Sequence, residues 1–246
     1  MPKTTSAAAV SAAAVNAART LPELDAAIEA CRACPRLVAW REEAGRVKVA
    51  RHRNDEYWAK PVPGFGDPDA RVVLIGLAPG AHGSNRTGRM FTGDASGDFL
   101  FPALHATGFG SQPNATRRGD GLELRGCRIV SAGRCAPPAN KPTRDELARC
   151  LPFLDRELQL LPNARVLVAL GSIGWDAAIK ALAALGHATP KPKPKFGHGA
   201  EATIGPYTLL GTYHPSQQNT FTGKLTQPML RAVLARAAQL AGIEGN

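Results

Sequence analysis

The sequence contains no apolar run that approaches the length needed to span a lipid bilayer. Residues 1–18 are rich in Ala and Ser, but they lack the apolar stretch of a secretory signal and the arginines of a transit peptide. We therefore expect a cytoplasmic protein whose residues 1–18 are disordered or form a frayed helix. No internal repeat is visible, and we expect residues 19–246 to form a single domain.

Neither of the two familiar phosphate-binding loops is present. Gly76, Gly80 and Gly83 do not fit G-x-G-x-x-G, and no G-K-[ST] follows them. Instead, the apolar run 72–77 predicts a buried strand that leads into a long loop rich in glycine, which extends to residue 97. Such a loop brings bare backbone close to a ligand, and this one is dense in hydrogen-bonding side chains. We expect a binding site there.

Cysteine is scarce, and in a chain without an export signal five cysteines favour a metal site over disulfides. Cys31 and Cys34 form a C-x-x-C pair, which Cys135 and Cys150 would complete. Cys127 precedes an apolar strand and fits a small buried hydrophobic residue better. Four thiolates can hold a [4Fe–4S] cluster or a structural zinc ion, and the spacing does not separate these two. Unrelated buried thiols are the alternative.

Positive charge exceeds negative charge, with 30 Lys and Arg against 20 Asp and Glu and a formal net charge of +10. This balance favours a polyanionic partner, nucleic acid before an anionic membrane surface. Residues 41–69 are basic and then rich in Pro and Gly, which predicts a connecting segment. Its cations would contact phosphates or simply be solvated.

Buried strands alternate with helices along the chain. We expect strands over 72–77, 128–131, 166–170 and 207–212, and helices over 20–31, 99–104, 143–161, 173–185 and 226–241. This order predicts a three-layer α/β/α fold with a mainly parallel sheet of about four strands. In such a sheet, ligands bind beyond the carboxyl ends of the strands. The segments that follow residues 77, 131 and 213 should therefore meet in one pocket.

Two long motifs carry a resemblance to a known family. The first is Gly76-Leu-Ala-Pro-Gly80 with the trailing segment 84–94, and the second is His214-Pro-Ser-Gln-Gln-Asn-Thr-Phe-Thr-Gly-Lys-Leu-Thr226. The chain resembles the uracil-DNA glycosylases from about residue 25 onward, and within them the type-5 group of bacteria and archaea. The four cysteines resemble the [4Fe–4S] site of the type-4 and type-5 groups.

The resemblance implies a monomeric bacterial enzyme that associates with the nucleoid through DNA. Its partner would be double-stranded DNA that contains uracil or other deaminated bases such as hypoxanthine and xanthine, with no membrane involved. Such an enzyme everts the damaged base from the helix, holds it, and cleaves its N-glycosidic bond.

Three residues are candidates for catalysis. His214 at a strand end would donate a hydrogen bond to the departing base as negative charge develops on it. Several relatives hold the attacking water with an Asn or Asp where this chain has Ala78. Because alanine cannot hold water, another residue must do so in this chain. Asp94 is the first candidate, although it would also serve as a helix cap. Asn85 is the second.

The everted base and the DNA strand need further contacts. The residues expected to bind the base are Gly76, Ala78, Gly80, Phe91 as the stacking platform, Ser131 and Asn140. Segment 217–224 is expected to enter the minor groove and fill the gap left by the everted nucleotide. The residues expected to contact DNA are Gln218, Asn219 and Lys224 from this segment, and Arg86 and Arg89, with Lys141, as phosphate contacts.

Two other classes of protein fit part of the sequence. A non-catalytic nucleic-acid-binding protein with a structural metal site would explain the charge and the four cysteines. An iron–sulfur electron carrier would explain the cysteines, but it does not explain the motif that begins at His214.

Overall fold

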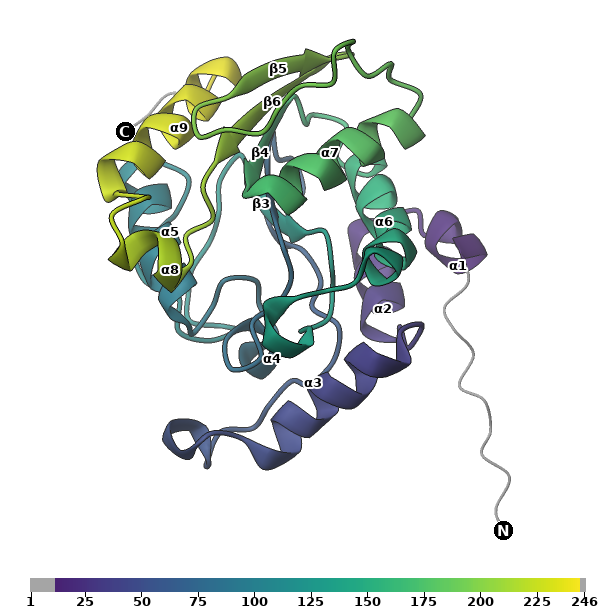
Figure 1. Cartoon of the computed structure of the whole chain (residues 1–246), viewed down its shortest axis with the longest axis vertical. Helices are drawn as coiled ribbons and strands as arrows, with labels where there is room; N and C mark the ends of the chain where they lie inside the picture. Colours follow the sequence, from purple (N-terminus) through teal and green to yellow (C-terminus); the bar gives the residue numbers. More distant parts are fainter. Residues whose placement is uncertain (1–11, 244–246) are drawn as a thin grey trace.

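The computed structural model describes residues 12–243, and its central element is a six-stranded sheet (Figure 1). The strands are β1 (Phe65–Gly66), β2 (Val72–Gly76), β3 (Cys127–Ser131), β4 (Val166–Leu170), β5 (Glu201–Ile204) and β6 (Tyr207–Thr212), in the order β1-β3-β2-β4-β6-β5. The four inner strands are parallel, and each edge strand is antiparallel to its neighbour. The expected parallel sheet is confirmed, with one short strand added at each edge.

Helices cover both faces of this sheet (Figure 1). The helices are α1 (Ala12–Ala17), α2 (Leu21–Glu29), α3 (Pro35–Val47), α4 (Ser84–Thr87), α5 (Ala95–Ala106), α6 (Arg144–Gln159), α7 (Ser172–Ala184), α8 (Gln217–Phe221) and α9 (Gln227–Leu240), with 3-10 turns η1 (Ala50–His52) and η2 (Pro138–Asn140). Between residues 12 and 243, no helix is long and apolar enough to cross a membrane.

The inner strands are buried on both faces, which explains their continuous apolar sequences. Side chains alternate between two core clusters. Leu74, for example, packs among residues of α5 and α9, whereas Val73 and Ile75 pack among residues of α6 and α7. This alternation places the sheet between two helical layers and confirms the three-layer fold.

The N-terminal helices form a third, smaller core. Val15 and Ala18 are buried against Leu24, Ile28 and Phe153. The segment 1–18, predicted to be disordered or a frayed helix, thus includes the helix α1, which apolar contacts to α2 and α6 hold in place. The remainder of that prediction, residues 1–11, lies outside the described residues.

The basic segment that was expected to be a connection is partly helical. Helix α3 extends to Val47, and η1 follows it at the end of the molecule that lies lowest in Figure 1. The chain then returns to the body, where Trp58 N donates to Arg86 O over 2.9 Å and Ala59 N donates to Asn85 O over 3.0 Å. These bonds attach the returning segment to the loop that follows β2.

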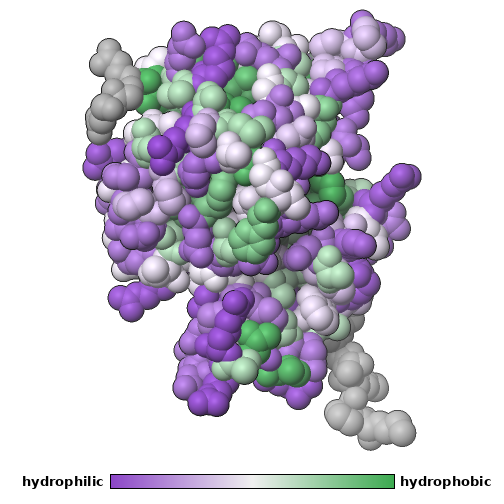
Figure 2. Space-filling view, turned by 60° about the vertical axis from the view of Figure 1, so that its left-hand side comes forward, coloured by the Kyte–Doolittle hydropathy of each residue, from purple (hydrophilic) through white to green (hydrophobic). Residues whose placement is uncertain are grey.

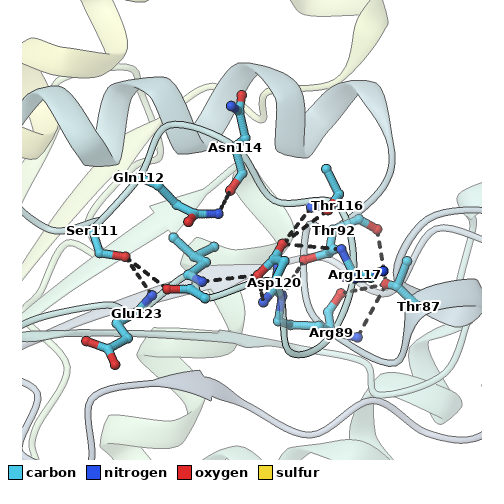
Figure 3. A network of polar contacts seen from close by, with 12 residues as sticks. Thr87, Arg89, Thr92, Ser111, Gln112, Asn114, Thr116, Arg117, Asp120 and Glu123 are labelled. Atoms are coloured by element: carbon cyan, nitrogen blue, oxygen red, sulfur yellow. Dashed lines mark hydrogen bonds and ion pairs between the residues drawn. The ribbon is translucent and has the colours of Figure 1, made fainter.

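The excursion of the chain between α5 and β3 is tied down by polar contacts (Figure 3). Asp120 accepts hydrogen bonds from the backbone N–H of Thr116 (2.8 Å) and Leu122 (3.1 Å), and it forms an ion pair with Arg89. Gly110 and Leu124 form an isolated antiparallel bridge. The excursion is thus an ordered loop closed by one carboxylate.

Candidate active site

The carboxyl ends of the parallel strands open into a single cleft of about 930 Å³. The predicted residues on its wall are Ala78, Gly80, Phe91, Asp94, Ser131, Asn140, Lys141, His214 and Gln218. The loop after β2, the segment after β3 and the segment after β6 therefore meet, as the parallel topology requires. Leu77 of the first segment and Gln218 of the third share this wall although they lie 141 positions apart in the sequence.

His214 follows β6 by two residues and lies beside Phe91, with 5.7 Å between the ring centroids and 32° between the ring planes. Burial lowers the pKa of His214 to about 4, so its imidazole is neutral at pH 7. Its backbone carbonyl accepts a hydrogen bond from Asn219 Nδ2 over 2.9 Å. The imidazole is thus a neutral hydrogen-bond donor held at a fixed strand end.

Phe91 occupies a backbone conformation that is unusual for an aromatic residue, with φ of 53°. Its N–H donates to Ser84 Oγ over 2.9 Å. A Cβ atom at Gly76 would lie 2.9 Å from the Phe91 ring, so that glycine makes room for the ring beneath the cleft. Phe91 is 7% exposed and belongs to the core cluster, yet it also forms part of the cleft wall. The ring therefore contacts both the core and the cleft.

Asp94 uses its two oxygens differently. Oδ1 accepts from Ser96 N over 3.0 Å and from Gly97 N over 3.1 Å, which caps α5. Oδ2 lies against the loop after β2, where a Cβ atom at Gly80 would come within 3.0 Å of it and one at Gly83 would overlap it. Burial raises the pKa of Asp94, and the two backbone hydrogen bonds oppose that rise. The capping role and a role in the cleft are therefore compatible.

Asn85 does not reach the cleft, so its candidacy as the water-positioning residue is corrected. The side chain is fully buried, and Nδ2 donates to Arg41 O over 3.1 Å and to Ala81 O over 3.3 Å. The amide faces α3 and attaches that helix to the loop after β2. Its role is to hold the loop.

Ser131 and Asn140 bring two different polar groups to the cleft. Ser131 Oγ donates to Gly133 O over 2.6 Å, which leaves its lone pairs as acceptors. Asn140 follows Ala139 in η2, and both residues have left-handed backbones, with φ of 56° and 52°. Asn is one of the residue types that tolerate this conformation. The turn presents the Asn140 amide at the rim.

Comparison with known proteins places this cleft in a family. A family model described as the uracil DNA glycosylase superfamily matches residues 63–238. A type-5 uracil-DNA glycosylase of Thermus thermophilus is 54% identical over 217 residues, which are 88% of this chain and 96% of that protein. Type-5 uracil-DNA glycosylases of Mycobacterium bovis and Mycobacterium leprae are 49% and 47% identical, each over 92% of this chain and over 84% and 98% of their own lengths. The chain is a type-5 member of the uracil-DNA glycosylase superfamily.

The two arginines expected to contact phosphate in this type-5 glycosylase are internal instead. Arg89 forms an ion pair with Asp120, with Nη2 to Oδ2 at 2.6 Å, and its side chain is 6% exposed (Figure 3). Arg86 donates to Asp55 Oδ2, to His82 O and to Gly93 O, all within 2.9 Å. Both predictions are corrected, because each guanidinium is already occupied in holding the loop after β2.

Helix α8 contributes further polar side chains to the glycosylase cleft. Gln218 lines the cleft, and Asn219 supports the His214 backbone instead of facing outward. Phe221 at the end of α8 is 80% exposed, which is high for an aromatic side chain. Lys224 Nζ lies 4.7 Å from the Tyr213 ring centroid, in a cation–π contact.

Two basic residues on the cleft wall were not predicted as site residues. Arg51 and His52, both of η1, line the same cleft as Asp94 and His214. The available signal in the sequence was the cluster of cations in 46–53, but its position beside the loop after β2 depends on the tertiary return of the chain.

The four cysteines predicted to bind a metal line one small cavity of about 20 Å³. Arg41 Nη1 donates to Cys135 Sγ over 3.0 Å, and the Arg134 N–H donates to Cys150 Sγ over 3.2 Å. Cys127 lies apart on β3 and is fully buried, as expected of a small hydrophobic residue. Within residues 12–243, no group of three Cys, His, Asp or Glu side chains is arranged to hold a single metal ion.

Proposed function

We propose that the protein is a monofunctional DNA glycosylase that removes uracil, hypoxanthine and xanthine from double-stranded DNA and so initiates base excision repair. The observation that carries this proposal is the meeting of Asp94 Oδ2, Phe91 and His214 in one cleft. Membership of the uracil-DNA glycosylase superfamily supports the reaction class. The polar groups around the base support the wider set of bases, and helix α8 supports the duplex substrate.

The residues of the cleft suit dissociative cleavage of the N-glycosidic bond. The bond from the sugar carbon to the base nitrogen breaks, and its electron pair leaves with the base. The neutral imidazole of His214 donates a hydrogen bond to the base oxygen as that charge develops. Such a donor accelerates the reaction because it binds the transition state more tightly than the substrate.

Asp94 serves the sugar side of the reaction. Its Oδ2 holds a water molecule and opposes the positive character of the sugar. The water oxygen bonds to the sugar carbon, Asp94 accepts the proton, and the released base takes up a proton from solvent. The raised pKa of Asp94 makes the carboxylate a better proton acceptor than an exposed one.

The polar groups around the base support a broad choice of substrate. Ser131 offers lone pairs, and the Asn140 amide both donates and accepts. A hydroxyl at the strand end discriminates less sharply among base edges than an amide would. Uracil, hypoxanthine and xanthine all present carbonyl oxygens that His214 can reach as donor.

Helix α8 supports a duplex substrate. Phe221 is exposed next to the cleft wall that Gln217 and Gln218 form. An apolar side chain inserted into the base stack fills the gap that an everted nucleotide leaves. We place the enzyme in the cytoplasm as a monomer bound to DNA.

We further propose that the four cysteines hold a [4Fe–4S] cluster. All four cysteines line one cavity, yet no three of them are spaced to hold a single metal ion. In a zinc site with four cysteine ligands, each sulfur would lie about 2.3 Å from the ion. A cluster binds each thiolate to a different iron and needs wider spacing. Hydrogen bonds from Arg41 and Arg134 to sulfur support anionic ligands. The cluster would join α3, α6 and the segment after β3.

Release of free base tests the glycosylase proposal. The protein is incubated with duplexes that contain uracil, hypoxanthine or xanthine, without added metal or nucleotide. We expect release from all three duplexes, and the His214→Ala variant is the control. Tight binding to these duplexes with no base released would instead favour a non-catalytic nucleic-acid-binding protein.

Colour tests the cluster separately. Purified protein should be brown, and Cys135→Ser should lose both visible absorbance and folded yield. Cys127→Ala is the matched control and should keep the colour, because Cys127 lies outside the cavity. A colourless protein that contains zinc would contradict the assignment.

A further inference from the structure

The segment after α3 forms an arm of residues 48–57 that reaches the cleft. In the space-filling view, the narrow lobe at the lower end of the molecule, where Figure 1 places α3, carries hydrophilic side chains around a smaller group of apolar ones (Figure 2). Arg51 and His52 of the arm lie on the cleft wall. The arm is therefore part of the site and not merely a connection.

Ion pairs hold the arm in one position. His52 Nδ1 lies 3.0 Å from Asp55 Oδ2, and the same oxygen accepts from Arg86 Nη1 over 2.9 Å. The backbone bonds from Trp58 and Ala59 to the loop after β2 fix the base of the arm. Asp55 is thus paired with the Arg86 guanidinium and held by a second contact to His52.

Arg51 is left available by these contacts. Its side chain is exposed, and within the described residues it has no acidic partner in an ion pair. By contrast, Arg86 and Arg89 both have carboxylate partners. A guanidinium presents a fork of donors that matches two oxygens of a phosphate.

His82 supplies a second donor on the same wall. Tyr57 Oη lies 3.0 Å from His82 Nδ1, and burial raises the pKa of Tyr57, so its hydroxyl keeps a proton to donate. Burial, together with the charge of Arg51, lowers the pKa of His82. A neutral imidazole that accepts at Nδ1 carries its proton at Nε2. When the Tyr57 hydroxyl donates to Nδ1, it selects the His82 tautomer that carries its proton at Nε2.

We propose that Arg51 and the Nε2–H of His82 form a subsite for a phosphodiester of the DNA strand that carries the everted nucleotide, with Tyr57 as the positioning residue. This inference rests on the proposed function, because it assumes a DNA strand along the cleft. Asp94 and Asp98 also line the cleft and repel phosphates. Cations on the arm offset that repulsion and keep the backbone away from the carboxylates.

The salt dependence of binding tests Arg51. Arg51→Gln is compared with wild type and with Lys180→Gln, which removes the same charge from an exposed site on α7. Binding to a duplex with an abasic site is measured over a series of salt concentrations. We expect Arg51→Gln to lower the slope of log affinity against log salt by about one, and Lys180→Gln to leave it unchanged. Equal slopes for wild type and Arg51→Gln would overturn the subsite.

Single-turnover base release separates this inference from the proposed function. Arg51→Gln should raise the DNA concentration for half-maximal rate and leave the maximal rate within about twofold of wild type. A loss of maximal rate at unchanged affinity would overturn the subsite. If wild type releases no base but Arg51→Gln still lowers the slope, the proposed function fails and the subsite stands.

The tautomer of His82 tests the positioning role of Tyr57. In wild type, nitrogen NMR should show His82 protonated at Nε2. In Tyr57→Phe the tautomers should mix and DNA affinity should fall, although the fold is kept. An unchanged tautomer in Tyr57→Phe, or a changed tautomer with unchanged affinity, would overturn that role.

Discussion

The two walls of the cleft are built in different ways. The wall from the sheet edge holds Asp94, Phe91 and His214 by backbone hydrogen bonds and by burial against the core. The wall from the arm presents Arg51, an exposed cation, on a segment attached through ion pairs. Rigid groups suit chemistry, which needs fixed donors, whereas exposed charge suits the screened attraction of a polyanion. Substitutions on the first wall should change rate, and those on the second should change affinity.

The largest expected effect on the first wall is that of His214→Ala. Loss of a donor aimed at the departing base should lower the single-turnover rate about 1,000-fold, with DNA affinity changed little. Saturating enzyme over a uracil duplex measures the rate, and an abasic duplex measures the affinity. Comparable losses of rate and affinity would mean that this residue binds DNA and would erase the contrast between the walls.

Arg89→Gln provides the opposite test of this comparison, because Arg89 belongs to the first motif but is buried. Removing it leaves Asp120 without its partner and should cost about 3 kcal/mol of unfolding free energy. The salt slope of DNA binding should remain that of wild type, in contrast to the expected result for Arg51→Gln. Denaturant titration measures the first effect. A reduced salt slope in a folded Arg89→Gln protein would mean that Arg89 contacts DNA.

The contrast between buried Arg89 and exposed Arg51 also bears on which features of the fold and the site the sequence could predict. The strands β2, β3 and β4 were predictable because both their faces are buried and their apolar runs are continuous. The meeting of three loops at one cleft followed from parallel topology. Edge strand β1 has two residues and β5 is largely exposed, so neither leaves a comparable pattern.

Side-chain direction was the part that the sequence could not supply. Arg86 and Arg89 each find a carboxylate 31 positions away in the chain, and nothing local indicates those partners. Asn85 and Asp94 both belong to the polar loop after β2, yet one amide faces α3 and one carboxylate faces the cleft. Helix α3 was not predicted, and its residues from 41 onward were interpreted as a connection because their charged surface resembles a solvated one.

A pair of substitutions at Asp94 separates its two oxygens. Asp94→Asn keeps an oxygen that can accept from Ser96 and Gly97, so the cap should persist while the rate falls about 100-fold. Asp94→Ala should show a similar rate loss and in addition lose about 1 kcal/mol of unfolding free energy with the cap. Thermal unfolding and single-turnover rates measure the two effects. Full activity in Asp94→Asn would exclude a proton-accepting carboxylate.

The smallest expected effect is the pH dependence that His214 imposes on stability. Burial lowers the pKa of His214 to about 4 in the folded protein from its ordinary value of 6.5, so the unfolded chain binds more protons between these values. Stability is therefore complete above about pH 6.5 and decreases as the pH falls toward 4. Between pH 7.5 and 5.5 the loss should be about 1 kcal/mol, and His214→Gln should lack that part. Denaturant titrations of both proteins at these two pH values measure it. If wild type and His214→Gln lose equal stability, the imidazole titrates normally, and the proposed neutral donor on the rigid wall is wrong.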